Sequence, residues 1–94
     1  MEEYILKIST KDEKGLIYNI SKVLFANNLN IDQNAEYVDE ETNEFFMRSL
    51  ISGKVMETIL QKELKEVLPD GAKITLNKIQ KKMLFFLLQK RAMF

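Results

Sequence analysis

The stretch NIDQNAEYVDEETNEFFMRSLIS, residues 30–52, decides the fold of this 94-residue chain. Two runs of β-type residues, 30–38 and 44–52, flank the five polar residues 39–43. Two such runs joined by a short polar loop are typical of a β-hairpin. We therefore expect an antiparallel strand pair in the middle of the chain.

Side chains alternate between the two faces of a strand, so each run predicts two faces. On the first strand one face is expected to carry Ile31, Ala35 and Tyr37, and the other Asp32, Asn34 and Glu36. On the second strand one face is expected to carry Phe45, Met47 and Ile51, and the other Phe46, Arg48 and Leu50. Because both faces of the second strand carry apolar side chains, we predict that it is central in its sheet.

On each side of the hairpin the sequence predicts one further strand and one helix. Residues 4–9 are β-rich, and residues 16–26 then carry apolar side chains at helical spacing. Asp12 is available as the N-cap of that helix, and Asn27 and Asn28 suit its end. After the hairpin, residues 56–68 again follow the helical period, and a Pro-Asp-Gly turn leads to a short strand over residues 72–76. The predicted order is β-α-β-β-α-β.

This order predicts an α+β, ferredoxin-like βαββαβ sandwich. Two β-α-β units with right-handed crossovers, joined by a hairpin, fold most simply into a four-stranded antiparallel sheet with both helices on one face. The other face of the sheet is left bare. We expect either the polar side chains of Asn34, Glu36 and Arg48 or a partner to cover it.

Composition excludes much chemistry. The chain has no cysteine and no histidine, so the commonest general base and the usual metal ligands are missing. We expect no cofactor and no metal site. The first residues are acidic and lack a long apolar run, and no segment approaches the roughly 20 apolar residues that span a bilayer. These features predict a cytoplasmic protein.

Charge is unevenly distributed although the formal net charge is zero. Residues 1–72 carry 8 Lys/Arg and 14 Asp/Glu, whereas residues 73–94 carry 6 Lys/Arg and no acid. The acidic folded part argues against nucleic-acid binding. A basic tail that lies on a membrane is an alternative. The apolar run Met83, Leu84, Phe85, Phe86, Leu87 and Leu88 is hydrophobic all round, which suits a buried strand better. We therefore expect no membrane partner.

The loop between the first strand and the first helix is a candidate site. Gly15 near a helix start costs roughly 1 kcal/mol relative to alanine. One explanation is that Gly15 lets the helix lie close to a strand. The other is that a helix start without a side chain accepts a small anion, such as the carboxylate of an amino acid. The local sequence leaves these two explanations open.

Several segments together resemble a known family. The run Asp12-Glu13-Lys14-Gly15-Leu16-Ile17 and the later Leu29-Asn30-Ile31, in a βαββαβ order, resemble an ACT domain, a small regulatory module that binds amino acids. Residues 30–34, 38–42 and 45–48 sharpen the match. Together they resemble the N-terminal ACT domain of the formyltetrahydrofolate deformylases, across about residues 4–90.

The resemblance implies two segments and no catalysis. Residues 1–78 would form the ACT regulatory domain. Residues 79–94 would form a basic linker and the first strand of a formyltransferase-like catalytic domain that this sequence does not contain. That domain carries the family's catalytic asparagine, histidine and aspartate, so this chain alone is not expected to hydrolyse formyltetrahydrofolate. The family acts in one-carbon metabolism and purine biosynthesis.

The resemblance also implies a ligand site between two copies of the chain. The effectors would be small amino acids, with methionine and glycine as candidates. The strand-helix loop of one copy would meet the second strand of its neighbour. The implied residues are Asp12, Gly15, Leu16, Ile17, Asn30, Ile31 and Asn34. The alternative is a purely structural association domain without a ligand, which pairs through edge strands or helices.

The run at residues 83–88 carries a separate hypothesis. Without a sheet of its own, such an apolar strand is prone to aggregate and must find cover on its own domain or on another chain. We expect that two or more chains pair these segments, so residues 83–88 are predicted oligomer contacts.

Overall fold

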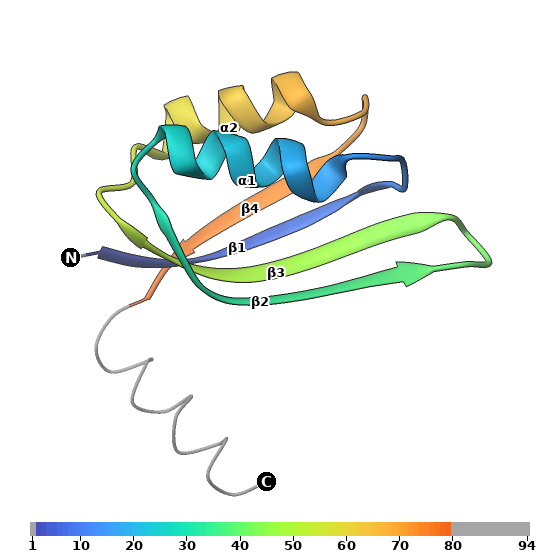
Figure 1. Cartoon of the computed structure of the whole chain (residues 1–94), viewed down its shortest axis with the longest axis horizontal. Coiled ribbons are helices and arrows are strands. Elements are labelled where there is room, and N and C mark those ends of the chain that lie inside the picture. The colour runs from blue at the N-terminus through green and yellow to red at the C-terminus, as the bar shows by residue number, and fades with distance from the viewer. Residues whose placement is uncertain (1, 80–94) are drawn as a thin grey trace, which may run out of the picture.

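A computed structural model describes residues 2–79 of the chain (Figure 1). The elements are β1 (Glu2–Lys11), α1 (Leu16–Ala26), β2 (Asn30–Asp39), β3 (Glu44–Gly53), α2 (Glu57–Val67) and β4 (Lys73–Lys78). The predicted βαββαβ order is confirmed. The predicted strand at residues 83–88 lies outside the described residues. The predicted boundary of the segment 79–94 lies at their limit. Both stay predictions.

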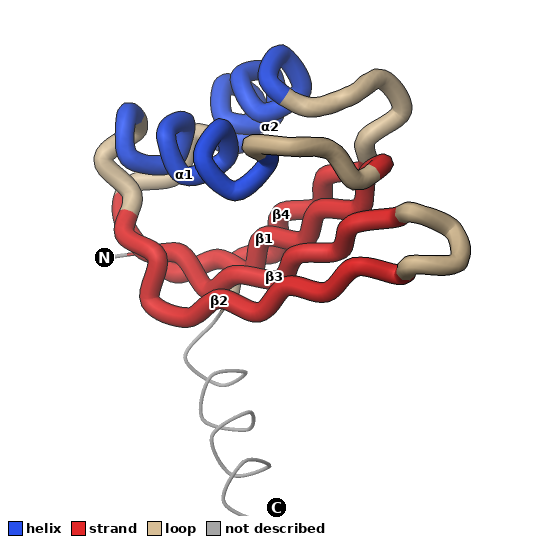
Figure 2. Tube along the Cα trace, turned by 45° about the vertical axis from the view of Figure 1, so that its right-hand side comes forward, coloured by secondary structure: helices blue, strands red, loops and turns tan. Residues whose placement is uncertain are grey.

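The four strands form one antiparallel sheet in the order β2-β3-β1-β4. Both helices cover the same face of this sheet (Figure 2). α1 lies over the β2 side and α2 over the β4 side. The ferredoxin-like fold is therefore as predicted, and β3 is an interior strand, as its two apolar faces indicated. β2 and β4 are the two edges.

The core lies between the helices and the sheet. Alternate residues of β1 and β3 face the helices, because buried positions alternate with more exposed ones along most of each strand. The apolar side chains that are almost fully buried come from β1, β3 and both helices: Leu6, Ile8, Ile20, Leu24, Ile51, Leu60 and Leu64. The apolar side chains at helical spacing thus pack on the alternate, inward-facing side chains of the strands.

The predicted faces of β2 are right only in part: Ala35 and Tyr37 share one face as predicted, but Ile31 lies on the other. The register shifts between Ile31 and Gln33, where the strand carries an irregularity. An extra residue in a strand reverses the faces of all residues that follow it. Ile31 therefore lies opposite the buried Ile51 on the helix side, while Tyr37 stacks on Phe46 on the other face, with ring centroids 5.8 Å apart.

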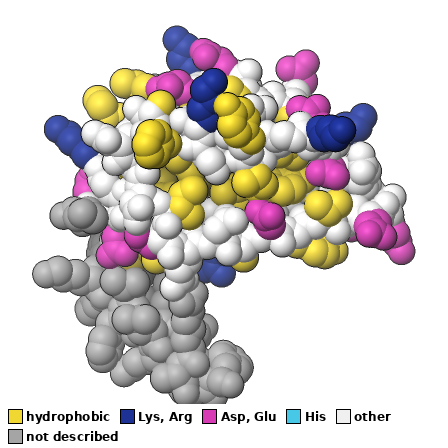
Figure 3. Space-filling view, in the orientation of Figure 1, with side chains coloured by type: hydrophobic (Ala, Val, Ile, Leu, Met, Phe, Trp, Pro, Cys, Tyr) yellow, Lys and Arg dark blue, Asp and Glu magenta, His cyan; other side chains and the backbone are white. Residues whose placement is uncertain are grey.

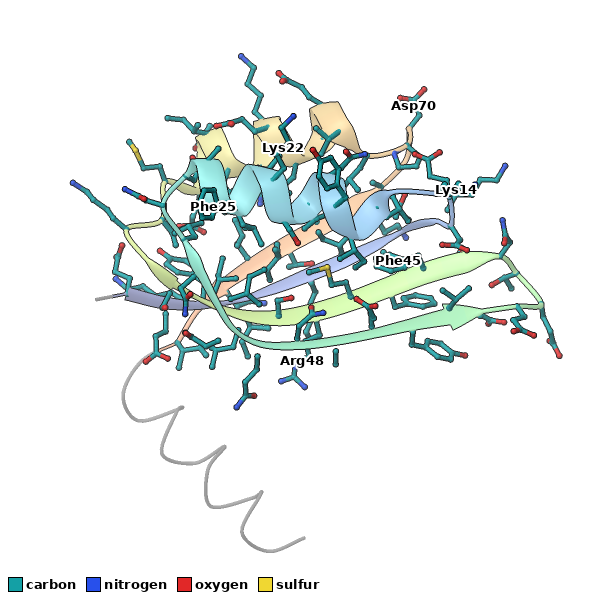
Figure 4. The ribbon with its side chains drawn as sticks, viewed as in Figure 1. Lys14, Lys22, Phe25, Phe45, Arg48 and Asp70 are labelled. Atoms are coloured by element: carbon teal, nitrogen blue, oxygen red, sulfur yellow. The ribbon has the colours of Figure 1, made fainter. Side chains whose placement is uncertain are left out.

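The same reversal corrects the expected polar cover of the bare face. Asn34 lies opposite the buried Ser49, and Glu36 opposite the buried Met47, so both belong to the helix side. Arg48 alone of the three expected residues lies on the face away from the helices (Figure 4).

The predicted start of α1 is also wrong. Asp12 is not its N-cap: the cap position is occupied by Gly15, and no side chain caps the helix. The predicted end is confirmed at Asn28, which has a left-handed φ of 61° directly after the helix.

An ion pair joins the ends of β1 and β4. Lys78 Nζ lies 3.0 Å from Glu2 Oε2. The hydrogen bond from Lys78, together with a weaker one from the Val55 amide, lowers the pKa of Glu2 below its usual range. The hydrogen bond to Glu2 likewise raises the pKa of Lys78.

These shifts predict how stability depends on pH. Because the pKa of Glu2 is lowered in the folded state, its contribution is present above the unfolded pKa and is lost as pH falls through the folded pKa. Glu2→Gln should therefore lower the melting temperature at neutral pH, and the difference from the parent should vanish in strong acid. Glu66→Gln on the exposed side of α2 is the control. A deficit of Glu2→Gln that stays constant from neutral to acidic pH would contradict this assignment.

Candidate ligand-binding site

The first turn of α1 offers unoccupied backbone donors. The first N–H groups of a helix have no partner within the helix, and here no side chain caps them. Gly15 has a φ of 83°, and a Cβ atom at this position would meet nothing within 4 Å. The glycine therefore does not serve a close approach to a strand. Its positive φ turns the chain into the helix and leaves the helix start open, which suits a small anion.

A buried hydroxyl without a partner lies at the same end of the sheet. Thr10 is 5% exposed, and its Oγ1 has no hydrogen-bond partner within the described part of the chain. It faces the helices from the end of β1, opposite Phe45, where the chain turns toward Gly15. Figure 4 shows Phe45 and Lys14 at this end of the molecule. Buried hydroxyls usually have a partner, so Thr10 is an exception within the described part of the chain.

The apolar residues predicted for the site belong largely to the core. The side chain of Leu16 is 3% exposed, so only its backbone amide is available to a ligand. Ile17 of α1 and Ile31 of β2 are half-buried and pack against the core. These two side chains can border a ligand, but each also has a structural role.

The two asparagines of β2 make hydrogen bonds within the chain. Asn30 Nδ2 donates to Asp32 Oδ1 at 2.6 Å on the exposed edge. The Asn34 side chain accepts a hydrogen bond from the buried Ser49 hydroxyl at 2.5 Å and donates to Glu36 at 3.2 Å. Asn34 thus satisfies a buried serine, whereas the hydrogen bond of Asn30 goes to a neighbour on its own strand.

The two halves of the predicted site lie at opposite ends of α1. Residues 12–17 precede or begin the helix, and Asn30 follows its end. The 11 residues of α1 make it about 16 Å long. A small amino acid therefore cannot contact both Asn30 and the loop along this edge of one chain.

A shallow hollow runs along that edge, between α1 and β2. It measures about 490 Å³ and is lined by Tyr18, Ser21, Lys22, Leu24, Phe25, Leu29, Asn30 and Ile31. The rings of Tyr18 and Phe25 are 69% and 84% exposed. Figure 3 shows hydrophobic side chains gathered along this side of the molecule. Because β2 is an edge strand, its outer backbone groups are also available for pairing.

Other kinds of site find no support in residues 2–79. Within this range no group of three or more acidic side chains could hold a metal ion. Nor does any helix in the described range have the length and apolar character needed to cross a membrane.

Comparisons with known proteins match the fold and most of the sequence. No family model matches the chain. Formyltetrahydrofolate deformylases of Escherichia coli (strain K12) and Haemophilus influenzae are 34% and 38% identical over 92 residues, which is 98% of this chain and 33% of each relative. The chain thus spans about a third of the length of these curated relatives.

Solved structures agree. A formyltetrahydrofolate deformylase from Pseudomonas putida has a TM-score of 0.69 at 18% identity. The match covers 80% of this chain and 28% of the deformylase chain. An ACT domain protein from Streptococcus pneumoniae has a TM-score of 0.66 at 23% identity. The match covers 82% of this chain and 89% of the ACT domain protein. The predicted resemblance is confirmed. The chain has an ACT-type fold, and it is homologous to about a third of the length of the formyltetrahydrofolate deformylases.

Proposed function

We propose that this chain is a non-catalytic regulatory module that binds a small amino acid, such as methionine or glycine, between two copies of itself. The observation that carries the proposal is the uncapped start of α1, with the unpartnered hydroxyl of Thr10 near the end of the preceding strand. Its deformylase relatives suggest that it regulates formyltetrahydrofolate hydrolysis in cytoplasmic one-carbon metabolism, while contributing no catalytic group itself.

The site residues follow from this arrangement. The carboxylate of the ligand would accept hydrogen bonds from the amides of Leu16 and Ile17, at the positive end of the helix dipole. Asp12, on the loop before Gly15, would face the ligand ammonium group. From the second copy, Asn30 and Ile31 would border the ligand side chain, and Asn34 would hold the strand beside it through Ser49.

Assembly of two copies along α1 and β2 would produce this geometry. Two edge strands that pair in opposite directions bring the loop of each copy toward the β2 strand of the other. The exposed rings of Tyr18 and Phe25 then lose contact with water, which favours association. A dimer of this kind has two equivalent sites, and each is built from both copies.

A ligand that binds only the folded dimer must stabilise it. At about ten times its dissociation constant, glycine or methionine should add about 1.4 kcal/mol and raise the melting temperature by several degrees. Glycinamide, which lacks the carboxylate, should have no effect. If no small amino acid changes the melting temperature, while the chain still dimerises, the purely structural association domain is the correct function.

Gly15 offers a sharper test of the ligand contact. Gly15→Ala should abolish the response to amino acids, because the new methyl group lies beside the free amides. It should also cost about 1 kcal/mol from the positive φ. Gly71→Ala is a matched control, since Gly71 also has a positive φ, of 87°, and open space around its Cβ position. Calorimetric titration of both variants checks this, and equal responses would contradict the assignment.

A further inference from the structure

The face of the sheet away from the helices, called here the open face, carries a hollow with an aromatic side. The hollow measures about 480 Å³, which is within the range of small-molecule sites. Tyr37 and Phe46 border it and stack on each other, with ring centroids 5.8 Å apart. Tyr37 is 61% exposed, so much of its ring surface is open to solvent. This side of the hollow therefore offers a stacking surface to another planar ring.

Three cations border the same hollow. Lys7 and Arg48 lie opposite each other on β1 and β3, and Lys73 lies on β4. All three side chains are exposed, and Figure 4 shows Arg48 pointing away from the helices. Within residues 2–79 no carboxylate forms an ion pair with any of the three, since the ion pair of this range joins Lys78 to Glu2. The hollow therefore attracts anions.

The rings and the cations have a fixed order across the sheet. One row of residues on β2, β3, β1 and β4 offers two rings, a hydroxyl and a cation: Tyr37, Phe46, Ser9 and Lys73. Neighbouring strands are about 4.8 Å apart, so the backbones of Phe46 and Lys73 are separated by about 10 Å. Lys7 and Arg48 lie in the next row, about 7 Å along the strands. A nucleotide has the same order, since its base, sugar and phosphate follow one another.

Acids limit the basic region of the open face at both ends. Glu3 lies toward the start of β1. Beyond the rings, one row holds two acids and one cation, so its net charge is negative: Asp39, Glu44 and Lys11. Glu36 also borders the hollow, but its side chain belongs to the helix side. A nucleic-acid strand would meet acids at both ends of the face, whereas a single nucleotide fits between them.

We propose that this hollow binds a single nucleoside phosphate. The base stacks on the exposed ring of Tyr37, and the sugar lies over Ser9. The phosphate accepts charge-assisted hydrogen bonds from Arg48 and Lys73, and Lys7 adds a third positive charge beside it. The site lies on the opposite side of the sheet from the amino-acid site and does not depend on it.

Calorimetric titration of the full chain with adenosine monophosphate (AMP) tests the proposal. AMP should bind with a dissociation constant below about 1 mM. Adenosine lacks the phosphate and ribose 5-phosphate lacks the base, so each should bind at least about tenfold more weakly. The affinity for AMP should fall as the salt concentration rises. No binding of AMP at millimolar concentration, or equal binding of AMP and ribose 5-phosphate, would overturn the proposal.

Folic acid distinguishes a nucleotide from another aromatic anion. It joins aromatic rings to carboxylates instead of to a phosphate, and it should bind more weakly than AMP because phosphate carries more charge in one group. Folic acid that binds more tightly than AMP would overturn the choice of a nucleotide.

Substitutions on the two faces of the molecule place the site. Lys73→Gln and Tyr37→Leu should each weaken AMP binding about tenfold, because one removes a phosphate contact and the other the stacking ring. Lys62→Gln is the control: it removes the same charge from an exposed position of α2, above the other face of the sheet, and should leave the affinity unchanged. Thermal unfolding checks that each variant is folded. Equal affinities of Lys73→Gln and Lys62→Gln for AMP would contradict a site on the open face.

Discussion

Replacing Gly53 by alanine should destabilise the fold by about 3 kcal/mol, from backbone strain and overpacking together. Gly53 has a φ of 135°, a conformation that L residues rarely adopt. A Cβ atom there would lie 2.9 Å from Leu29 Cδ2 and 3.1 Å from the Asn28 carbonyl oxygen. The end of β3 is thus packed directly against the turn between α1 and β2.

Urea denaturation of Gly53→Ala and Gly71→Ala measures this effect. Gly71 shares the positive φ but has open space around its Cβ position, so its alanine variant should lose only about 1 kcal/mol. Equal losses would mean that the contact with Leu29 relaxes freely and that the turn is not fixed as described.

Truncating Leu60 to alanine should cost about 2–5 kcal/mol, through lost burial and a cavity in the core. The Leu60 side chain is 1% exposed, between α2 and the sheet. Ile59→Ala, one position earlier, should cost less than about 1 kcal/mol, because Ile59 is 45% exposed. Thermal and urea unfolding of both variants checks which face of α2 is inside, and similar losses would contradict the packing.

The order of elements was predictable because each element has a clear period. Apolar residues at three-and-four spacing indicated both helices, and the hairpin loop at residues 39–43 separated two β-rich runs. The irregularity between Ile31 and Gln33 was not predictable, because an extra residue in a strand leaves no mark in the alternation of a largely polar edge strand. The placement of Asn34 was therefore wrong.

Only some residues of the candidate site stand out in the sequence. Gly15 stood out because glycine is unusual near a helix start, although it precedes the helix instead of lying within it. Thr10 gave no signal, since threonine is common in strands and its unpartnered hydroxyl is visible only in three dimensions. Tyr18 and Phe25, seven residues apart, lie on one face of α1 outside its buried stripe. That spacing is a signal from which their exposure could have been predicted.

Mixing two inactive variants tests most directly the central claim that two copies share each amino-acid site. Gly15→Ala disables the loop, and Asn30→Leu removes the amide of β2. Each variant alone should bind no amino acid. In a mixed dimer, one site keeps both an intact loop and an intact β2 strand.

The account therefore predicts that an equal mixture, after exchange of subunits, regains about a quarter of the wild-type binding sites in a calorimetric titration with glycine or methionine. A mixture that binds no more amino acid than the separate variants would contradict a site shared between two chains.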